Sequence, residues 1–503
     1  MPDSLPCRCT PLLAVNYAPL QSEATHVRNM ISKHEQEFEE IDVEIAILLS
    51  RRQGLMKHIQ GLKCILSHIH RLPEEILTSI FILTLPKAES WFPHSDTDSY
   101  YMPVCKRWRA VSLSCQALWL RPVIPANSRL SVATFSRQLS CSGNSPLDVR
   151  LWCKTDTPQM AGLLEAIVRC SQRWSALDIT CRSDWTEFRN QLDHLKGNVG
   201  QLREVQIVGI WSSEAAQWGG DQFESFAVAP RLQTLTVAHV RDPAQSLLLP
   251  WHQLTKYRST GRADDHLRVL RLCPNLISAQ LSTTDHLEID DTQPLVVLPR
   301  LRKLYVVPDL LHRLSLPVLE EIVLDRQHHD PIFPLLSLCL RDNPPLSCVF
   351  LLPGALVAAT AISLLEQTST ITTLRIHVAG RDPAPQGLDA LLERLSVAHE
   401  HRPCIAPDLV KLTFSGKSEV FGDRFLDMVE SRWKHESGNL DCACRPLEQI
   451  EFLDPGWRRL RSDIAQRLRA LEEEGMHVRI GRLSFDWNAM ETQDWRYPCR
   501  SIS

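Results

Sequence analysis

The sequence predicts an α/β protein in which a long N-terminal helix and a small three-helix segment precede a large region of alternating strands and helices. Apolar residues recur with heptad spacing over residues 23–70, and a Leu-Pro pair opens a run of short helical patterns over 71–122. Segments of the form Leu-x-x-Leu-x-apolar then repeat through 123–485. We expect the proline-rich residues 1–22 to be disordered, and assign no role to the tail 486–503.

The composition is that of an ordinary globular protein. The 503 residues suffice for two or three domains, with 23% charged and 44% hydrophobic residues. A formal net charge of −4 gives no electrostatic reason to expect nucleic-acid or membrane binding. Sixteen cysteines, scattered singly, fit reduced thiols better than a disulfide framework. Because neither a secretory signal nor a membrane-length apolar run is evident, we expect a cytoplasmic and/or nuclear protein.

The predicted long helix, residues 23–70, carries an apolar seam. His34 and Arg52 interrupt this seam, and Gly54 and Gly61 each weaken the helix by about 1 kcal/mol relative to Ala. Such a seam is typical of a coiled coil, which would allow self-association through residues 24–69; a single amphipathic helix lying against its own chain is the alternative. The two seam positions hold Ile31, Phe38, Ile45, Ile59 and Leu66, and Ile41, Leu48, Leu55, Leu62 and Ile69.

Residues 71–122 predict three short helices. Pro73 suits the first position of a helix, and Glu74 and Glu75 complement its dipole in the first turn. A wide apolar stripe follows, until Pro86 ends the helix, and we expect a loop over 86–103. A second helix has Val104, Trp108 and Val111 on one face, and Ser114 is expected to cap a third. The stripe of the first helix consists of Ile76, Leu77, Ile80, Phe81 and Leu83.

Three short helices bury little surface, so part of this apolar surface is expected to remain exposed and to need a partner. The spacing alone favours a helical subdomain packed onto the rest of the chain. The combination of Leu72-Pro73, Val104-Cys105-Lys106-Arg107-Trp108 and Leu118-Trp119 favours another interpretation, because it resembles an F-box. F-boxes are protein-docking modules and not catalysts.

The order of heptad helix, F-box and irregular repeats also resembles fungal-type F-box proteins. This resemblance implies that the segment docks on a Skp-type adaptor, and through it on a cullin–RING ubiquitin ligase, while the repeat domain holds an unknown protein substrate. The chain would then be a substrate receptor without catalytic residues of its own. A binding scaffold without any ligase is the alternative. Carried over from the motif, the adaptor-binding residues would be Leu72, Pro73, Ile76, Leu77, Ile80, Phe81, Val104, Cys105, Trp108, Leu118 and Trp119.

Nine segments of the large region share the apolar spacing Leu-x-x-Leu-x-apolar, and Leu254-Thr255-Lys256-Tyr257 is a weaker copy. Most gaps between their starts are near the roughly 20–29 residues of a leucine-rich repeat, although the last two are longer. Helical patterns lie between them, one with Phe425, Met428, Val429 and Trp433, and another that Gly475 closes in the place of a C-cap. We interpret the region as a degenerate leucine-rich-repeat-like solenoid; an ordinary α/β domain with a parallel sheet is the alternative. The segments start at Leu202, Leu232, Leu254, Leu276, Leu301, Leu319, Leu346, Ile371, Leu409 and Leu447.

No constellation in the sequence predicts catalysis, a metal site or a cofactor. His328-His329-Asp330 is the most metal-like cluster, but it lacks a second ligand pair at a fixed spacing. The Cys7-x-Cys9 and Cys442-x-Cys444 pairs have no neighbouring histidine pair, and His68-x-His70 is expected to be solvated. Phosphate-binding glycine loops and nucleophile elbows are also missing. An enzyme hidden in the α/β region would therefore need a deep polar pocket to support it.

Overall fold

The chain divides into two compact units, Met1–Ile80 and Phe81–Ser503, which are described separately. Residues 1–19, the tail 486–503 and most of the expected loop, 86–100, lie outside the described residues. The structure, a computed structural model, describes residues 20–66, 68–85, 101–124, 131–153, 158–181, 192, 195–209, 222–283, 294–324, 332–351, 358–377, 388–397, 404–415, 423–434, 444–454 and 462–482.

The first unit contains the long helix α2 (Gln21–Ile65) that the heptad pattern predicts. The helix stops short of the expected end, and a 3-10 turn, η1 (His68–Arg71), follows it. Leu66 N still donates to the Leu62 carbonyl at 3.3 Å, and η1 then leads to Pro73, which cannot continue a hydrogen-bonded helix. The seam residues Leu66 and Ile69 therefore lie beyond α2. None of the helices in the described parts of the chain combines the length and apolar character that a membrane crossing needs.

Three short helical elements follow, as the 71–122 pattern predicts. They are α3 (Glu74–Leu83), α5 (Lys106–Ser114) and the 3-10 helix η2 (Gln116–Trp119). The predicted cap is wrong: Ser114 is the last residue of α5, and its hydroxyl donates to the Val111 carbonyl at 3.0 Å. Cys115 takes the N-cap position of η2 instead, without a side-chain hydrogen bond.

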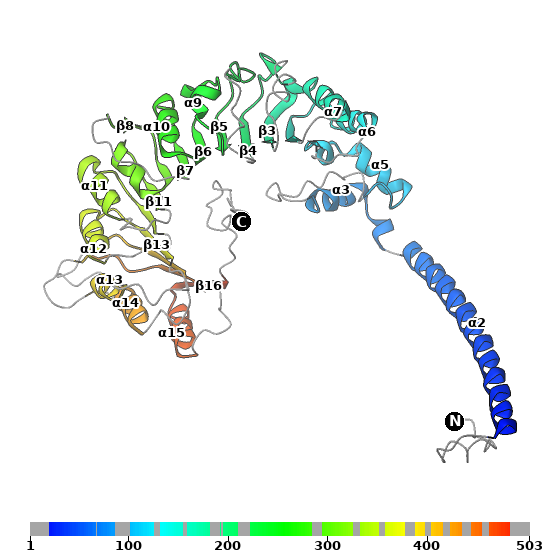
Figure 1. The fold of residues 1–503 in the computed structure, drawn as a ribbon. Helices are drawn as coiled ribbons and strands as arrows, with labels where there is room; N and C mark the ends of the chain where they lie inside the picture. Colours follow the sequence, from blue (N-terminus) through cyan, green and yellow to red (C-terminus); the bar gives the residue numbers. More distant parts are fainter. Residues whose placement is uncertain are drawn as a thin grey trace. The chain divides into compact units, whose positions relative to one another are not determined.

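A parallel sheet of 14 strands organises the second unit, and its strands lie side by side in chain order (Figure 1). Two strands stand apart from it, β8 (Val296–Val297) and β10 (Leu314–Ser315), which pair with each other. The strands of the large sheet are β1 (Val123–Ile124), β2 (Leu147–Cys153), β3 (Trp174–Cys181), β4 (Glu204–Gly209), β5 (Thr234–Ala238), β6 (Lys256–Gly261), β7 (Ser278–Thr283), β9 (Lys303–Val306), β11 (Glu321–Leu324), β12 (Cys348–Leu351), β13 (Thr373–His377), β14 (Lys411–Ser415), β15 (Gln449–Asp454) and β16 (His477–Arg482).

Helices connect most successive strands and lie along one side of the large sheet (Figure 1). Parallel neighbours require such crossover connections. The helices are α6 (Val132–Cys141), α7 (Pro158–Val168), α9 (Pro243–Ser246), α10 (Ala263–Leu272), α11 (Phe333–Asp342), α12 (Ala358–Gln367), α13 (Leu388–Leu395), α14 (Asp423–Trp433) and α15 (Ser462–Glu473), with 3-10 turns η3 (Ser171–Arg173), η5 (Trp251–Gln253) and η6 (Pro308–Arg313).

The repeated apolar spacing specifies the strands and the core together. Each of the ten predicted segments contains a strand that begins two residues after the segment's first Leu or Ile. In the segment of β9, for example, Leu301, Leu304 and Val306 are all at most 1% exposed. Side chains alternate across a strand, so the residues between them lie on the other face of the sheet.

Backbone hydrogen bonds extend the sheet one residue before the strands themselves. Arg203 N donates to the Ser175 carbonyl at 2.9 Å, and Gln233 N donates to the Arg203 carbonyl at 2.9 Å. The same step recurs down to His477, whose N–H donates to the Glu448 carbonyl at 3.0 Å. Each strand segment is thus hydrogen-bonded to the next at the same position, whatever the length of the connection between them.

Two of the strands outside the ten predicted segments show why the sequence pattern did not identify them. β3 follows the same spacing, but Trp174 takes the first apolar position, and Leu177 and Ile179 take the next two. In β2 the register shifts between Leu147 and Asp148, so its apolar residues are spaced one residue closer.

The predicted C-cap of α15 is present. Gly475 has a φ of +105°, a conformation that side chains rarely adopt, and its N–H donates to the Glu472 carbonyl at 3.0 Å. Met476 N then donates to the Leu471 carbonyl at 3.0 Å. The chain turns at this point from α15 into β16.

Candidate functional site

The helix α3 has one buried and one unburied apolar stripe. Leu77 and Phe81, one turn apart, are at most 1% exposed. Ile76, Ile80 and Leu83 recur at i, i+4 and i+7, and of these Ile76 is 49% and Leu83 84% exposed. A short helix with an 84% exposed leucine at its end has apolar surface that its own fold leaves in solvent.

Three aromatic residues hold the end of α3 within the second unit. The ring of Phe81 stacks on Tyr101 with centroids 4.4 Å apart, and contacts Trp108 at 4.9 Å with the planes tilted by 60°. The Tyr101 hydroxyl lies 2.6 Å from the Thr84 hydroxyl and donates to the Phe81 carbonyl at 3.2 Å. The Phe81 carbonyl, at the helix terminus, also accepts from the Thr84 hydroxyl at 2.9 Å, so two side-chain hydroxyls take the place of the missing backbone donor. Tyr101 lies in the segment predicted to be a loop, and its contact with Phe81 was not predicted.

The second and third helical elements are joined by a tryptophan. Trp119 is 5% exposed, and its indole N–H donates to the Ser112 carbonyl of α5 at 2.8 Å. At the other end of α5, the Cys105 thiol caps the helix by accepting from Trp108 N at 3.4 Å. The side chain of Arg109 donates to the Met102 carbonyl at 3.1 Å, which fixes the turn before α5.

The eleven predicted adaptor-binding residues therefore separate into two sets. Leu77, Phe81, Leu118 and Trp119 are buried. The other seven reach the surface: Leu72, Ile80, Cys105 and Trp108 in part, and Pro73, Ile76 and Val104 to more than a third. Leu83, which was outside the predicted set, is 84% exposed, against 49% for Ile76 and 51% for Val104.

The polar face of the large sheet is a second candidate surface. Neighbouring strands place charged residues side by side there, as with Lys303 of β9 and Glu321 of β11, whose charged atoms lie 3.1 Å apart. Lys256, Arg258, Arg375, Lys411 and Arg479 add positive charge on later strands. The first strands instead carry Asp148, Asp178 and Glu204, with Arg150 among them.

Glu451 joins three strands on this face. Its carboxylate accepts from the Lys411 ammonium at 3.0 Å, from the Thr413 hydroxyl at 3.1 Å and from the Gln449 amide at 3.1 Å. Arg479 of β16 lies 3.8 Å away. Although burial raises its pKa, these bonds outweigh that effect, and the pKa of Glu451 is lowered. Glu451 is therefore an anchored anion among cations.

Asp178 of β3 differs from Glu451 in that its pKa is raised. Burial raises its pKa to about 6, and the neighbouring Asp148 and Glu204 add to that effect while Arg150 opposes it. Among the described residues, no hydrogen bond reaches its Oδ1 atom. The ionised form of this carboxyl therefore loses hydration on burial without hydrogen bonds to Oδ1 that would compensate.

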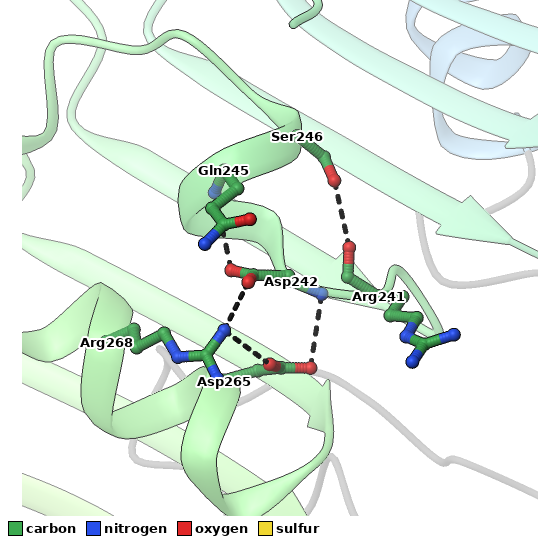
Figure 2. A network of polar contacts seen from close by, with 6 residues as sticks. All are labelled: Arg241, Asp242, Gln245, Ser246, Asp265 and Arg268. Atoms are coloured by element: carbon green, nitrogen blue, oxygen red, sulfur yellow. Dashed lines mark hydrogen bonds and ion pairs between the residues drawn. The ribbon is translucent and has the colours of Figure 1, made fainter. Parts of the chain in front are cut away.

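A polar hollow of about 410 Å³ lies where β5 and β6 end and α9 and α10 begin. Figure 2 shows its central network, in which Arg268 pairs with Asp242 and approaches Asp265 at 3.9 Å. The backbone N–H of Asp242 donates to the Asp265 carboxylate at 3.1 Å. Burial is the main cause that raises the pKa of Asp265. The lining residues are Arg241, Asp242, Gln245, Ser246, Arg262, Asp264, Asp265 and Arg268.

The chemistry of this hollow does not identify a catalytic group. The Ser246 hydroxyl, its only hydroxyl among the lining residues, donates to the Arg241 carbonyl at 2.9 Å and is not activated by a base (Figure 2). Its central carboxylates, those of Asp242 and Asp265, accept from Arg268 and from the backbone N–H groups of Gln245 and Asp242. The described part of the chain also holds no group of three or more His, Cys, Asp or Glu residues suited to a metal ion.

The cysteine and histidine clusters named in the sequence add no reactive group among the described residues. Cys7-x-Cys9, His328-His329-Asp330 and Cys442 lie outside the described residues, while Cys444 is buried, which raises its pKa. Burial raises the pKa of Cys273 to about 12, so this thiol is unreactive. Cys404 is disulfide-bonded, and for this residue the expectation of a reduced thiol is wrong.

Comparison with known proteins adds no relative: no known protein family matches this chain, and neither does any curated protein.

Proposed function

We propose that this chain is the substrate-recognition subunit of a cullin–RING (SCF-type) ubiquitin ligase. In this proposal, residues 71–122 act as an F-box that docks on a Skp-type adaptor, and the second unit's sheet region is a leucine-rich-repeat-like solenoid that binds a protein substrate. The observation that carries the proposal is the unburied apolar stripe of α3, in the segment whose sequence resembles an F-box.

The two sets of residues have different roles in this proposal. The buried residues Phe81, Leu118 and Trp119 shape the module, together with Tyr101. The adaptor contacts are made by exposed apolar residues, with Ile76 and Leu83 of α3 foremost. A standard interface buries about 800 Å² per partner and depends on a few apolar anchors. Ubiquitin transfer is performed by other subunits, and this chain contributes by tethering, which raises the effective concentration of the substrate.

The polar face of the sheet is the proposed substrate surface. Its ion pairs and hydrogen bonds, such as those of Glu451, fix the charged groups in place before a partner arrives. Such preorganisation reduces the entropy lost on binding. The charges favour a substrate with an acidic segment over the later strands and a basic one over the first strands.

The docking half of the proposal is tested by co-purifying the full chain with a Skp-type adaptor. We expect wild type to retain the adaptor and Leu83→Asp or Ile76→Asp to lose it. Ile277→Asp is the matched control, because Ile277 is 44% exposed but lies in the sheet region. Failure of wild type to bind, or equal recovery for all variants, would favour the alternative of a scaffold without ligase function.

A further inference from the structure

The helix α2 exposes a continuous apolar seam along most of its length. All eight apolar seam residues from Ile31 to Leu62 are roughly half exposed, and Phe38 is 65% exposed. The two glycines lie away from this seam, with open space around them. Helices in proteins gain most of their stability from packing an apolar face, so a 45-residue helix with this face uncovered needs a partner.

Charge is divided between the two halves of α2. Residues 35–44 contain six acidic residues and no lysine or arginine, whereas residues 51–63 contain four lysines and arginines and no acidic residue. One half of the helix is thus complementary to the other. Each half also contains one polar seam residue, His34 in the first half and Arg52 in the second.

A parallel, in-register pair of these helices would bring like charges together. Each layer of such a pair contains the same residue twice, so Arg52 would meet Arg52 at the seam, and the acidic stretches would lie side by side. The flanking positions Glu37 and Asp42 would also face each other across the two helices. Like charges at such positions are destabilising.

An antiparallel pair removes these conflicts in one particular register. When Ile45 lies opposite Leu48 of the second copy, Phe38 lies opposite Leu55 and Ile31 opposite Leu62. The same register brings Glu44 beside Arg51 of the second copy and Glu37 beside His58. Arg52 then meets the layer of Ile41, next to Asp42.

We propose that two copies of this chain associate through α2 as an antiparallel coiled coil, centred between Ala46 and Ile47. The apolar seam provides the affinity, and the opposed acidic and basic halves select orientation and register. Each copy would carry its own docking segment and sheet, so the assembly would be bivalent.

The mass of the full chain in solution tests association first. A monomer has a mass of 57.3 kDa, and we expect light scattering after size exclusion to give about twice that value. Leu48→Glu in the seam should return the chain to the monomer mass while the melting transition of the sheet region is unchanged. A wild-type chain that stays monomeric at tens of micromolar, with α2 lying against its own chain or not, would overturn the proposal.

Charge reversal tests the register. Glu44→Arg and Arg51→Glu should each weaken the dimer about tenfold, since two symmetric ion pairs become repulsive, and the double variant should restore wild-type affinity. Glu39→Arg is the control, because it makes the same charge change on the outward side of the helix. Neither a parallel pair nor another register predicts rescue by the double variant, so absence of rescue contradicts the proposed pairing.

Orientation is measured between labels introduced at Gln36 of both copies through an unnatural amino acid, which leaves the cysteines unlabelled. In the antiparallel register the two sites are 21 residues apart along the axis, or about 32 Å at 1.5 Å per residue. A parallel pair would place them within about two helix diameters, roughly 20 Å, and would overturn the proposal. Adaptor recovery measured on Leu48→Glu separates the two proposals, because docking through α3 does not depend on the dimer.

Discussion

The helix α3 and the large sheet differ in how far their apolar residues are exposed to solvent. In the strands, the repeated apolar positions are buried almost completely, as Leu304 and Ile322 are. In α3, by contrast, Leu77 and Phe81 are buried while Ile76 and Leu83 stay in solvent. Each strand has a neighbour that covers it, whereas a short helix has only the few residues around it. The difference separates a region whose apolar positions are covered from a helix that keeps one apolar stripe in solvent.

The largest effect is expected inside the sheet region, at Arg432 of α14. Its guanidinium is fully buried and donates to the Leu395 and Ile405 carbonyls at 2.6 Å and to the Ala406 carbonyl at 3.2 Å. We expect Arg432→Ala to cost about 3–5 kcal/mol in the free energy of unfolding, because three carbonyls lose a buried charged donor and the Leu409 N–H remains only for that of Ala406. Chemical denaturation measures this, with Arg424→Ala as the control.

Arg424 lies on the same helix, but its ion pair with Asp389 is exposed. Its substitution should change the free energy of unfolding by at most about 0.5 kcal/mol. Equal effects for the two arginines would contradict the role assigned to Arg432.

The next prediction tests the comparison itself with one type of substitution in both regions. Leu304→Ala should lower the free energy of unfolding by about 2–5 kcal/mol, because it leaves a cavity in a sealed core. Leu83→Ala should change it by about 0.5 kcal/mol or less, because the side chain is already in water. If thermal denaturation shows Leu83→Ala to be as costly as Leu304→Ala, α3 has no free surface.

A pH dependence is expected from Asp178. Its pKa is about 6 in the folded protein against an ordinary value of 3.8 for an aspartate, so the folded state binds its proton more tightly. Its contribution to stability is therefore lost as pH rises from about 4 to about 6 and stays lost above that range. Asp178→Asn should be more stable than wild type at pH 7 by about 1–3 kcal/mol, and equal to it near pH 4. A difference that does not vary with pH would contradict this assignment.

The smallest effect is expected at the turn between α15 and β16. Gly475→Ala should cost about 1 kcal/mol, because alanine is strained at a φ of +105°. Gly200→Ala is the control, since Gly200 has ordinary backbone angles and open space around it. Thermal denaturation that ranks the two variants in the reverse order would show that the turn is not constrained.

The sequence predicted the local features of this fold and missed the features that depend on register. The first apolar residue of each repeat located ten strands, because a strand and its core positions share one short pattern. The pair of Lys411 and Glu451, 40 residues apart, required knowledge of which residues face each other across strands. Tyr101 was missed for a similar reason, since nothing in its own segment indicates that it stacks on Phe81.

The candidate docking residues were predicted as a group but not in their separate roles. The motif includes Leu77 and Trp119 on equal terms with Ile76, although the first two are buried and the last is exposed. Spacing alone cannot make this distinction, because adjacent stripes of a short helix are both apolar. Only the packing shows which stripe remains available.

Hydrogen exchange of the full chain, with and without a purified Skp-type adaptor, tests the central claim most directly. We predict that the adaptor slows exchange in α3 and in residues 101–119, while strands β4 to β15 exchange at the same rate in both samples. No change in α3, or protection confined to the strands, would contradict the assignment of α3 as the docking surface.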